Sequence, residues 1–177
     1  MQPTTLRINP VFGLLAFLLA VLAFAAGVPA SAQAGCNHSG ESVRSITKDN
    51  ARAAIGCLFN KERSADNVKG NGDLHDAAQS HSAVMASQNC YSHQCSGEGN
   101  LLQRVARTGY LRGSSSYELG EVILIASDKA SSRQIVSAWM GSPGHRANIM
   151  RSSYDHVGVG LSIRSGRVYA SGDLGSR

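Results

Sequence analysis

The segment Trp139–Met150 is the strongest constraint in this chain, because it places a proline, a glycine and a histidine side by side in the order Ser142-Pro143-Gly144-His145. Pro143 has a fixed φ angle and keeps the residue before it out of helical geometry, while Gly144 tolerates turns that other residues resist. The segment therefore predicts a sharp bend that presents His145, with a short helix starting there. We interpret this bend as part of a functional site.

The first 34 residues are typical of a secretory signal peptide. Arg7 lies in a short polar start, an apolar run of about 16 residues extends from Val11 to Ala26, and Ala32-Gln33-Ala34 offers small residues for cleavage. This run is shorter than the ~20 residues of a comfortable membrane span. We expect cleavage before Gly35, a secreted protein and no stable membrane span in the mature chain. Gln33 stands where a lipoprotein signal has an aliphatic residue, so lipidation of Cys36 is the minor alternative.

The remaining residues, 35–177, are enough for one domain with a continuous hydrophobic core. We divide them into an N-terminal extension, 35–45, and a folded domain, 46–177, and we expect a monomer. The formal charge of the whole chain is +5. Its basic residues are scattered rather than clustered, so the sequence does not predict a nucleic-acid-binding protein.

All four cysteines lie in the part of the chain that we expect to be exported: Cys36, Cys57, Cys90 and Cys95. Export into an oxidising compartment favours disulfide bonds. Three pairings are possible in principle; Cys90 and Cys95 are close enough in sequence to staple one loop, which leaves Cys36 to join Cys57. A zinc cluster is the competing interpretation, but the chain has no Cys-x-x-Cys pair.

Hydrophobic periodicity predicts helices around a small sheet, which is an α+β fold. Helices are expected at about residues 47–63, 73–88, 100–108 and 131–139. Thr47 and Asn71 are suited to begin the first two helices, and Gly109 is suited to end the third. Strands are expected at about residues 122–126, 156–163 and 168–173, and Ser165-Gly166 between the last two predicts a hairpin turn.

Two helices carry residues whose burial matters for the site. On the third, we expect the apolar side chains to face the core: Leu101, Leu102, Val105 and Ala106. On the second, His81 shares the apolar face, so we interpret it as a core histidine with a satisfied hydrogen bond and leave it out of the site.

The segment Trp139–Met150 resembles the Trp-x-x-Ser-Pro-Gly-His-Arg-x-Asn-Ile signature of bacterial members of the CAP superfamily, the group of cysteine-rich secretory proteins, insect antigen 5 and plant pathogenesis-related proteins. Asn60 and Arg63 are similar to the Asn-x-x-Arg pair that ends the family's first helix. The resemblance runs from about residue 55 to Gly175. It implies an α-β-α sandwich in which helices flank a small, mostly antiparallel sheet.

Compared motif by motif with this family, four residues are expected to line a polar cleft: His93, Glu121, Gln134 and His145. Glu121 looks like the glutamate of the family's Gly-Glu-Asn-Ile element, although Val122 replaces the asparagine. Gln134 stands where many relatives carry a second glutamate. His93 and His145 look like the two histidines of the cleft.

Two neutral imidazoles can supply nitrogen ligands to zinc, and a nearby carboxylate can orient one of the rings. We predict that His93 and His145 bind zinc weakly, because two histidines fall short of the usual three or four protein ligands and Gln134 supplies no charge. The competing interpretation is a hydrogen-bonded polar cluster that holds two loops against the sheet. A bridge between Cys90 and Cys95 would restrict the loop that presents His93.

The sequence carries neither a His-Glu-x-x-His metalloprotease motif nor a Gly-x-Ser-x-Gly nucleophile elbow. We therefore interpret the chain as a secreted binding or interaction protein rather than an enzyme. Eukaryotic relatives bind sterols and fatty acids, so the resemblance admits a small apolar ligand as well as a cell-envelope component. The alternative is a metal-assisted hydrolase that acts on cell-envelope peptide or glycan.

Overall fold

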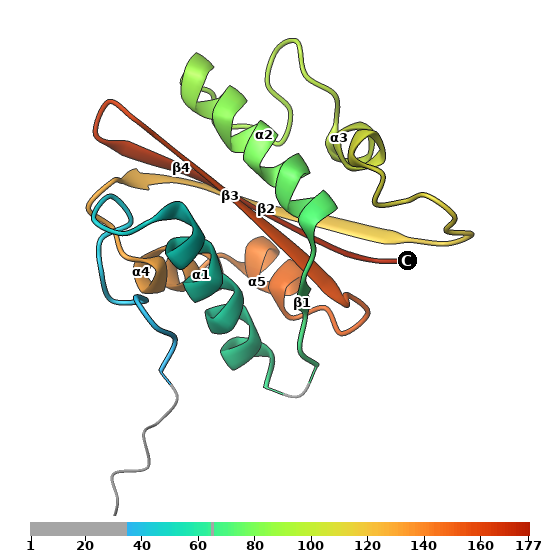
Figure 1. Ribbon diagram of the computed structural model, residues 1–177, viewed down its shortest axis with the longest axis horizontal. Helices are drawn as coiled ribbons and strands as arrows, with labels where there is room; N and C mark the ends of the chain where they lie inside the picture. The colour runs from blue at the N-terminus through green and yellow to red at the C-terminus, as the bar shows by residue number, and fades with distance from the viewer. Residues whose placement is uncertain (1–34, 65) are drawn as a thin grey trace, which may run out of the picture. The chain divides into compact units, whose positions relative to one another are not determined.

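A four-stranded mixed sheet forms the middle layer of the domain (Figure 1). The computed structural model describes residues 35–64 and 66–177, so the expected signal peptide lies outside the described residues. The strands, in the spatial order β1-β3-β4-β2, are β1 (Lys69–Gly70), β3 (His156–Arg164), β4 (Arg167–Ser176) and β2 (Glu118–Ser127). The three long strands are antiparallel, and β1 pairs in parallel with β3.

Helices cover both faces of this sheet, which confirms the α-β-α sandwich (Figure 1). One face carries three helices: α1 (Lys48–Arg63), α4 (Ser132–Met140) and α5 (Pro143–Ile149). The other face carries two: α2 (Gly72–Gln88) and α3 (Leu101–Thr108). No helix in the described part of the chain combines the length and the apolar character needed to cross a membrane.

The ends of the helices follow the local chemistry that the sequence predicts. Thr47 and Asn71 accept hydrogen bonds from the backbone at the starts of α1 and α2, and Gly109 ends α3 with a φ of 95°. Ser165 and Gly166 both have positive φ angles, 51° and 75°, and close the predicted hairpin between β3 and β4.

The bend at Pro143 differs in one respect from the prediction. Ser142 is extended (φ −98°, ψ 120°), and Pro143 opens α5 in its first turn, as expected. Gly144, however, lies inside the helix without a positive φ angle, and a Cβ added there would meet nothing within 4 Å. The turn therefore comes from the Ser142-Pro143 junction, and Gly144 is not needed for it.

Large apolar side chains fill the space between the sheet and α1, α4 and α5. Trp139 is fully buried, its ring lies edge-on to Phe59 with centroids 5.7 Å apart, and its Nε1 donates to the carbonyl of Ile123 at 2.9 Å. This bond satisfies the polar edge of the indole and caps a carbonyl on the outer edge of β2. Val122, whose side chain points to the same face, belongs to this core.

Helix α2 lies unusually close to β3. A Cβ added to Gly158 would sit 2.1 Å from the backbone nitrogen of His75, and one added to Gly160 would sit 2.2 Å from the carbonyl oxygen of Ala78. Glycine is therefore required at both positions for the helix to approach the strand. This close approach sets the height of α2 above the sheet.

Both disulfide bonds pair as expected, Cys36 with Cys57 and Cys90 with Cys95, and the described residues contain no free cysteine. The first bond ties the N-terminal extension to α1. Val43 in this extension is buried and donates from its backbone to the carbonyl of Ala130 at 2.9 Å. Residues 36–45 thus pack against the domain instead of trailing from it.

Two details of the fold differ from the predictions. The stretch before α2, for which the sequence predicts neither helix nor strand, contains β1, which pairs with β3 through backbone contacts that hydrophobic patterning does not reveal. On α3, Leu102 is 41% exposed and Ala106 is also exposed, whereas Arg104 is buried. The core prediction for Leu102 and Ala106 was wrong because the helix turns Arg104 inward.

Candidate functional site

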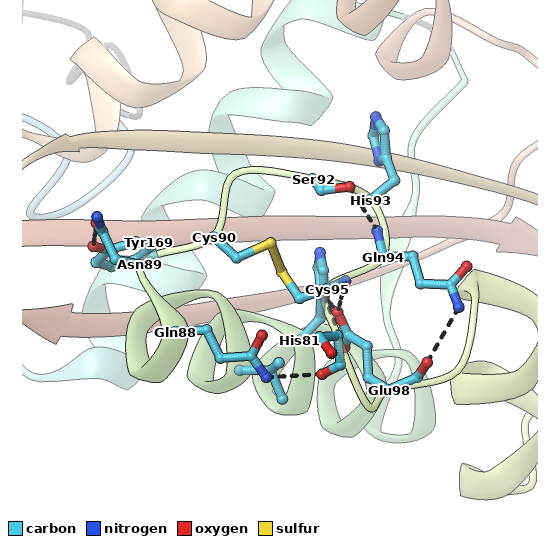
Figure 2. The surroundings of a disulfide bond; sticks show 12 residues. His81, Gln88, Asn89, Cys90, Ser92, His93, Gln94, Cys95, Glu98 and Tyr169 are labelled. Atoms are coloured by element: carbon cyan, nitrogen blue, oxygen red, sulfur yellow. Dashed lines mark hydrogen bonds and ion pairs between the residues drawn. A yellow bond between two sulfur atoms is a disulfide. The ribbon is translucent and has the colours of Figure 1, made fainter.

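His93 lies on the short loop that the Cys90–Cys95 disulfide closes (Figure 2). Asn89 ends α2 in the left-handed conformation, with a φ of 51°, and turns the chain into this loop. The side chain of His93 points away from the bridge and remains 59% exposed. The loop therefore presents an imidazole to solvent from a short, covalently closed ring.

Glu121 supports the imidazole from the sheet. Its side chain is buried, and its Oε1 lies 2.7 Å from Nδ1 of His93. Because a carboxylate accepts, Nδ1 of His93 donates, and Nε2 is the nitrogen left for a ligand. The hydrogen bond to Glu121 raises the pKa of His93 above its ordinary value of 6.5, against the smaller opposing effect of burial.

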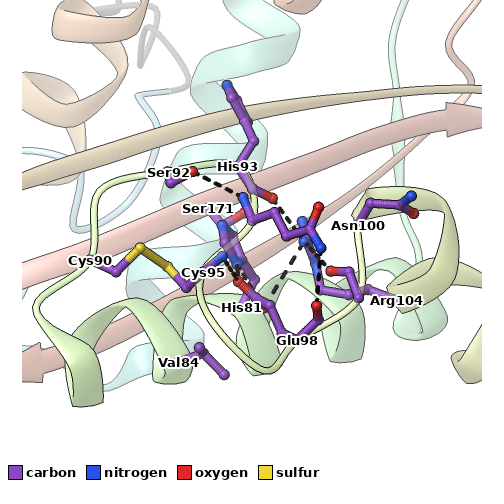
Figure 3. A network of polar contacts seen from close by, with 12 residues as sticks. His81, Val84, Cys90, Ser92, His93, Cys95, Glu98, Asn100, Arg104 and Ser171 are labelled. Carbon is purple, nitrogen blue, oxygen red and sulfur yellow. Dashed lines mark hydrogen bonds and ion pairs between the residues drawn. A yellow bond between two sulfur atoms is a disulfide. The ribbon is translucent and has the colours of Figure 1, made fainter.

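Arg104 contacts the other oxygen of Glu121 from α3. Its guanidinium also donates to the carbonyls of His93 at 2.9 Å and Gly99 at 3.0 Å, so one cation joins the loop, the helix and the sheet (Figure 3). Burial alone would raise the pKa of Glu121, but the His93 hydrogen bond and the charge of Arg104 outweigh it and keep this pKa below its ordinary value. Glu121 is therefore a buried carboxylate that stays ionised.

A second carboxylate extends the network toward α2. Glu98 lies 2.9 Å from Nδ1 of His81 and accepts from the backbone nitrogen of Cys95 at 2.7 Å. The fully buried ring of His81 also brings its Nε2 to 3.8 Å from Glu121. The expectation of a core histidine with a partner is confirmed, and its ring, which lies between the two carboxylates, belongs to the network that supports His93.

His145 lies in the first turn of α5 and is partly buried. Burial, and secondly the charge of His93, lowers its pKa below 6.5. No hydrogen bond or ion pair in the described part of the chain joins His145 to the His93 network, so the charge of His93 acts on it only at a distance. His145 is thus inclined to be neutral at pH values where His93 still holds a proton.

The structure places Gln134 apart from the other three predicted residues. Its Oε1 accepts a hydrogen bond from the backbone nitrogen of Ser131 at 2.9 Å, and the hydroxyl of Ser131 accepts from the Gln134 backbone in return. This reciprocal pair is a capping box at the start of α4. Gln134 lines a separate hollow with Leu124 and Ala126, and no contact joins it to the His93 network.

The donor set does not fit a resident zinc ion. Among residues 35–64 and 66–177, no three histidine, cysteine or acidic side chains are grouped so as to hold a metal. Both oxygens of Glu121 are already engaged, by His93 and by Arg104. Two imidazoles, those of His93 and His145, are what the site offers, one fewer than the three protein ligands of catalytic zinc sites.

Sequence reasoning missed Arg104 and Glu98, and also Ser171, whose hydroxyl lies 3.3 Å from Oε2 of Glu121. Arg104 shares the buried side of α3 with Leu101 and Val105, at helical spacing, so a lone cation in an apolar stripe was the available signal. Ser171 and Asp173 alternate with apolar residues along β4 and occupy its other face. Nothing in the sequence alone pairs Glu98 with His81.

A hollow of about 540 Å³ lies elsewhere, between α1 and the start of α2, and its lining includes Arg52, Gly56 and His75. None of the four predicted cleft residues lines it. The His93 site is a surface site around an exposed ring, and it is separate from this hollow.

With the fold and the polar network in place, the chain belongs to the CAP superfamily, the cysteine-rich secretory protein family, whose sequence pattern matches residues 49–173. The curated relative YkwD of Bacillus subtilis (strain 168) is 30% identical over 122 residues. That match covers 67% of this chain and 44% of YkwD, so the chain spans less than half of this relative.

Solved structures agree in fold. An extracellular protein with an SCP domain from Bacillus anthracis is 22% identical, with a TM-score of 0.56, and the match covers 73% of this chain and 43% of that protein. An outer surface protein of Borrelia burgdorferi is 15% identical, also with a TM-score of 0.56, and the match covers 75% of this chain and 96% of that protein. At these identities the likeness shows the fold alone.

Proposed function

We propose that this protein is exported and acts as a binding module, whose site is the surface formed by His93 and His145. The observation that carries the proposal is the 2.7 Å contact between His93 Nδ1 and the buried Glu121, which leaves Nε2 of an exposed ring directed away from its support. Two disulfide bonds and the extracellular or outer-surface description of two structural relatives support export.

The cost of burying charges supports a functional role for this arrangement. The side chains of Arg104 and Glu121 are each 3% exposed. Taking an ion out of water costs about several kcal/mol in a real protein, and the attraction between the two ions must offset this cost. Apolar residues would fill the same volume at lower cost. The network is thus better explained as a device that holds the His93 ring than as a source of stability.

The ligand is a cell-envelope component or a small apolar molecule, and a divalent metal such as zinc binds weakly to the two imidazoles. Binding is favoured over nucleophilic catalysis because all four cysteines are in disulfides and no described hydroxyl or thiol hydrogen-bonds to either ring of the site. A metal-assisted hydrolase is the second candidate, since an imidazole backed by a carboxylate can also act as a general base.

Calorimetric titration with zinc tests the site. The tag-free protein should bind zinc weakly, and the double variant His93→Ala, His145→Ala should lose this binding while its melting temperature shows that it is folded. His38→Ala is the matched control, because His38 is an exposed histidine that contacts Glu41 instead of the network. Zinc binding that is unchanged in the double variant would remove these histidines as the site.

The same titration has a predicted pH dependence. Zinc competes with the proton on His93, whose pKa is raised, so affinity should increase as the pH rises through and above 6.5. For the hydrolase candidate, release of peptide or sugar fragments from envelope material should require His145 and added metal. Inactivity of the wild type on both kinds of material would eliminate that candidate and leave the binding site untouched.

A further inference from the structure

Beneath the His93 site, two acidic residues lie directly opposite each other in the sheet. Glu121 of β2 pairs with Asp173 of β4, so both side chains point to the same face. Glu121 is 5% exposed and Asp173 is fully buried. Like charges directly opposite in an antiparallel pair are destabilising, and burial makes the repulsion stronger.

The charged groups around the pair do not fully compensate a charge on Asp173. Glu121 from β2 and Arg104 from α3 act on it directly. His81 from α2, and His93 and Glu98 from the loop between α2 and α3, join the same network through Glu121 and Arg104. Among the described residues, none of the cations forms an ion pair with Asp173, and its Oδ2 has no hydrogen-bond partner. An ionised carboxylate in this position would be buried without an ion-pair partner, and the charge of Arg104 offsets only part of the cost.

The hydroxyl of Ser171 provides a second, independent argument. Its Oγ lies 3.3 Å from Oε2 of Glu121 and 3.2 Å from Oδ1 of Asp173. A hydroxyl has one proton and can donate to only one of these oxygens. If both acids were ionised, the Ser171 oxygen would lie close to the other carboxylate oxygen with no hydrogen between them. A proton on Oδ1 of Asp173 removes this conflict, because Asp173 then donates to Ser171 and Ser171 donates to Glu121.

We propose that Asp173 is a neutral carboxylic acid at neutral pH and acts as a positioning residue, whose proton starts a chain of hydrogen bonds from Asp173 through Ser171 to Glu121. The chain ends on the carboxylate that holds Nδ1 of His93, and so it fixes the ring from below. Burial, followed by the charge of Glu121, raises the pKa of Asp173 well above its ordinary value, in agreement with this assignment. The proposal does not depend on any ligand of the site.

The carboxyl carbon of Asp173 reports its protonation directly. In the wild-type protein labelled with carbon-13, this carbon should keep the chemical shift of a protonated acid at pH 7, while the exposed Asp49 shows that of a carboxylate. The shift of an ionised carboxylate for Asp173 at pH 7 would overturn the proposal, and this measurement requires no variant to fold.

The variant Asp173→Asn then tests the chain of hydrogen bonds, with Asp173→Ala for comparison. The amide of asparagine can donate to Ser171, so Asp173→Asn should keep His93 in the tautomer with hydrogen on Nδ1, seen by nitrogen-15 NMR, while Asp173→Ala and Ser171→Ala disturb it. Adding Asp173→Ala to Ser171→Ala should disturb the tautomer no further than Ser171→Ala alone, because the effect of Asp173 passes through Ser171. Equal disturbance by asparagine and alanine would contradict the role of a donor.

The pH dependence of stability offers another test, because a neutral Asp173 predicts whether stability rises or falls with pH. Above the ordinary pKa of aspartate, about 3.9, the unfolded wild-type chain releases a proton that the folded chain retains. Wild-type stability contributed by this group is therefore lost as the pH rises toward the raised pKa, whereas Asp173→Asn lacks the effect. The ratio of the folding constants, variant to wild type, should rise by up to about tenfold per pH unit. A ratio that is constant or falls would refute a neutral Asp173.

Discussion

The two faces of the sheet differ most clearly along a single strand, β4. The residues that face α1, α4 and α5 are apolar, namely Val168, Ala170 and Leu174, whereas Ser171 and Asp173 face α2 and α3. Both sets are buried. One strand thus contributes a hydrophobic core to one layer and a buried hydrogen-bonded network to the other.

This difference separates stability from function within one small domain. The apolar face gains free energy from removing side chains from water, about 25 cal/mol per Å² of apolar surface. The face that carries α2 and α3 also buries apolar side chains, such as Met85 and Tyr169, but its polar network gains little net stability, because desolvation of Glu121 and Arg104 opposes their attraction. We infer that the apolar side chains of both faces hold the domain together and that the polar network of the second face orients His93.

The largest expected effect is on the apolar face. Trp139→Ala removes a fully buried side chain, its contact with Phe59 and its hydrogen bond to Ile123, and should lower the free energy of unfolding by about 3–5 kcal/mol. Urea denaturation measures this loss. Trp139→Phe, which keeps an aromatic ring, should lower the free energy of unfolding clearly less. A loss below about 1 kcal/mol for the alanine variant would mean that this face is not the main source of stability.

A somewhat smaller loss is expected from the polar face. Arg104→Met leaves Glu121 buried without its cation and should cost about 3 kcal/mol at neutral pH. Because the pKa of Glu121 is lowered in the folded protein, its ionised form stabilises the fold at pH values above the ordinary pKa of 4.5. This stabilisation is lost as the pH falls through the folded-state pKa. The difference in unfolding free energy between variant and wild type should therefore shrink in acid.

Two further variants separate charge from packing in this prediction. Glu121→Gln added to Arg104→Met should recover part of the stability, since no unpaired charge remains. Arg107→Met changes an exposed arginine of the same helix and should alter the unfolding free energy by no more than about 0.5 kcal/mol. If Arg104→Met and Arg107→Met lower the unfolding free energy equally, the buried ion pair is not the cause of the loss.

The smallest effect is expected outside both regions. Gln134→Glu retains an acceptor for the backbone nitrogen of Ser131 at the start of α4 and should stabilise the protein by a few tenths of a kcal/mol, about the value of a charge at a helix start. Zinc affinity should not change, because this side chain serves as a cap. Tighter zinc binding in the calorimeter would show that residue 134 joins the His93 site.

The parts of the fold that the sequence predicts are those that depend on local signals. Caps at Thr47 and Asn71, the Ser165-Gly166 turn and helical periodicity each act within a few residues, and the structure has all of them. β1 was missed because two residues carry no periodicity and pair with a strand far along the chain. The burial of Arg104 was missed because its partner, Glu121, belongs to another element.

The site was predictable only where a motif marks a residue. His93, Glu121 and His145 were found from motifs, and the structure brings the first two into contact. Gln134 was placed in the cleft because relatives carry a glutamate there, but a glutamine in the first turn of a helix has a nearer partner in the capping residue, Ser131. The pairing of Asp173 with Glu121 across β4 and β2 could not be predicted, because it depends on the register of the two strands, which no local sequence signal specifies.

The two glycines of β3 also limit how the domain can move. Because Gly158 and Gly160 let the backbone of α2 rest almost on the strand, sliding the helix along the sheet would force it over neighbouring side chains. Helix and strand should behave as one rigid body, whose amide hydrogens exchange slowly and together. The loop that carries His93 leaves α2 at Asn89 and therefore starts from this rigid body.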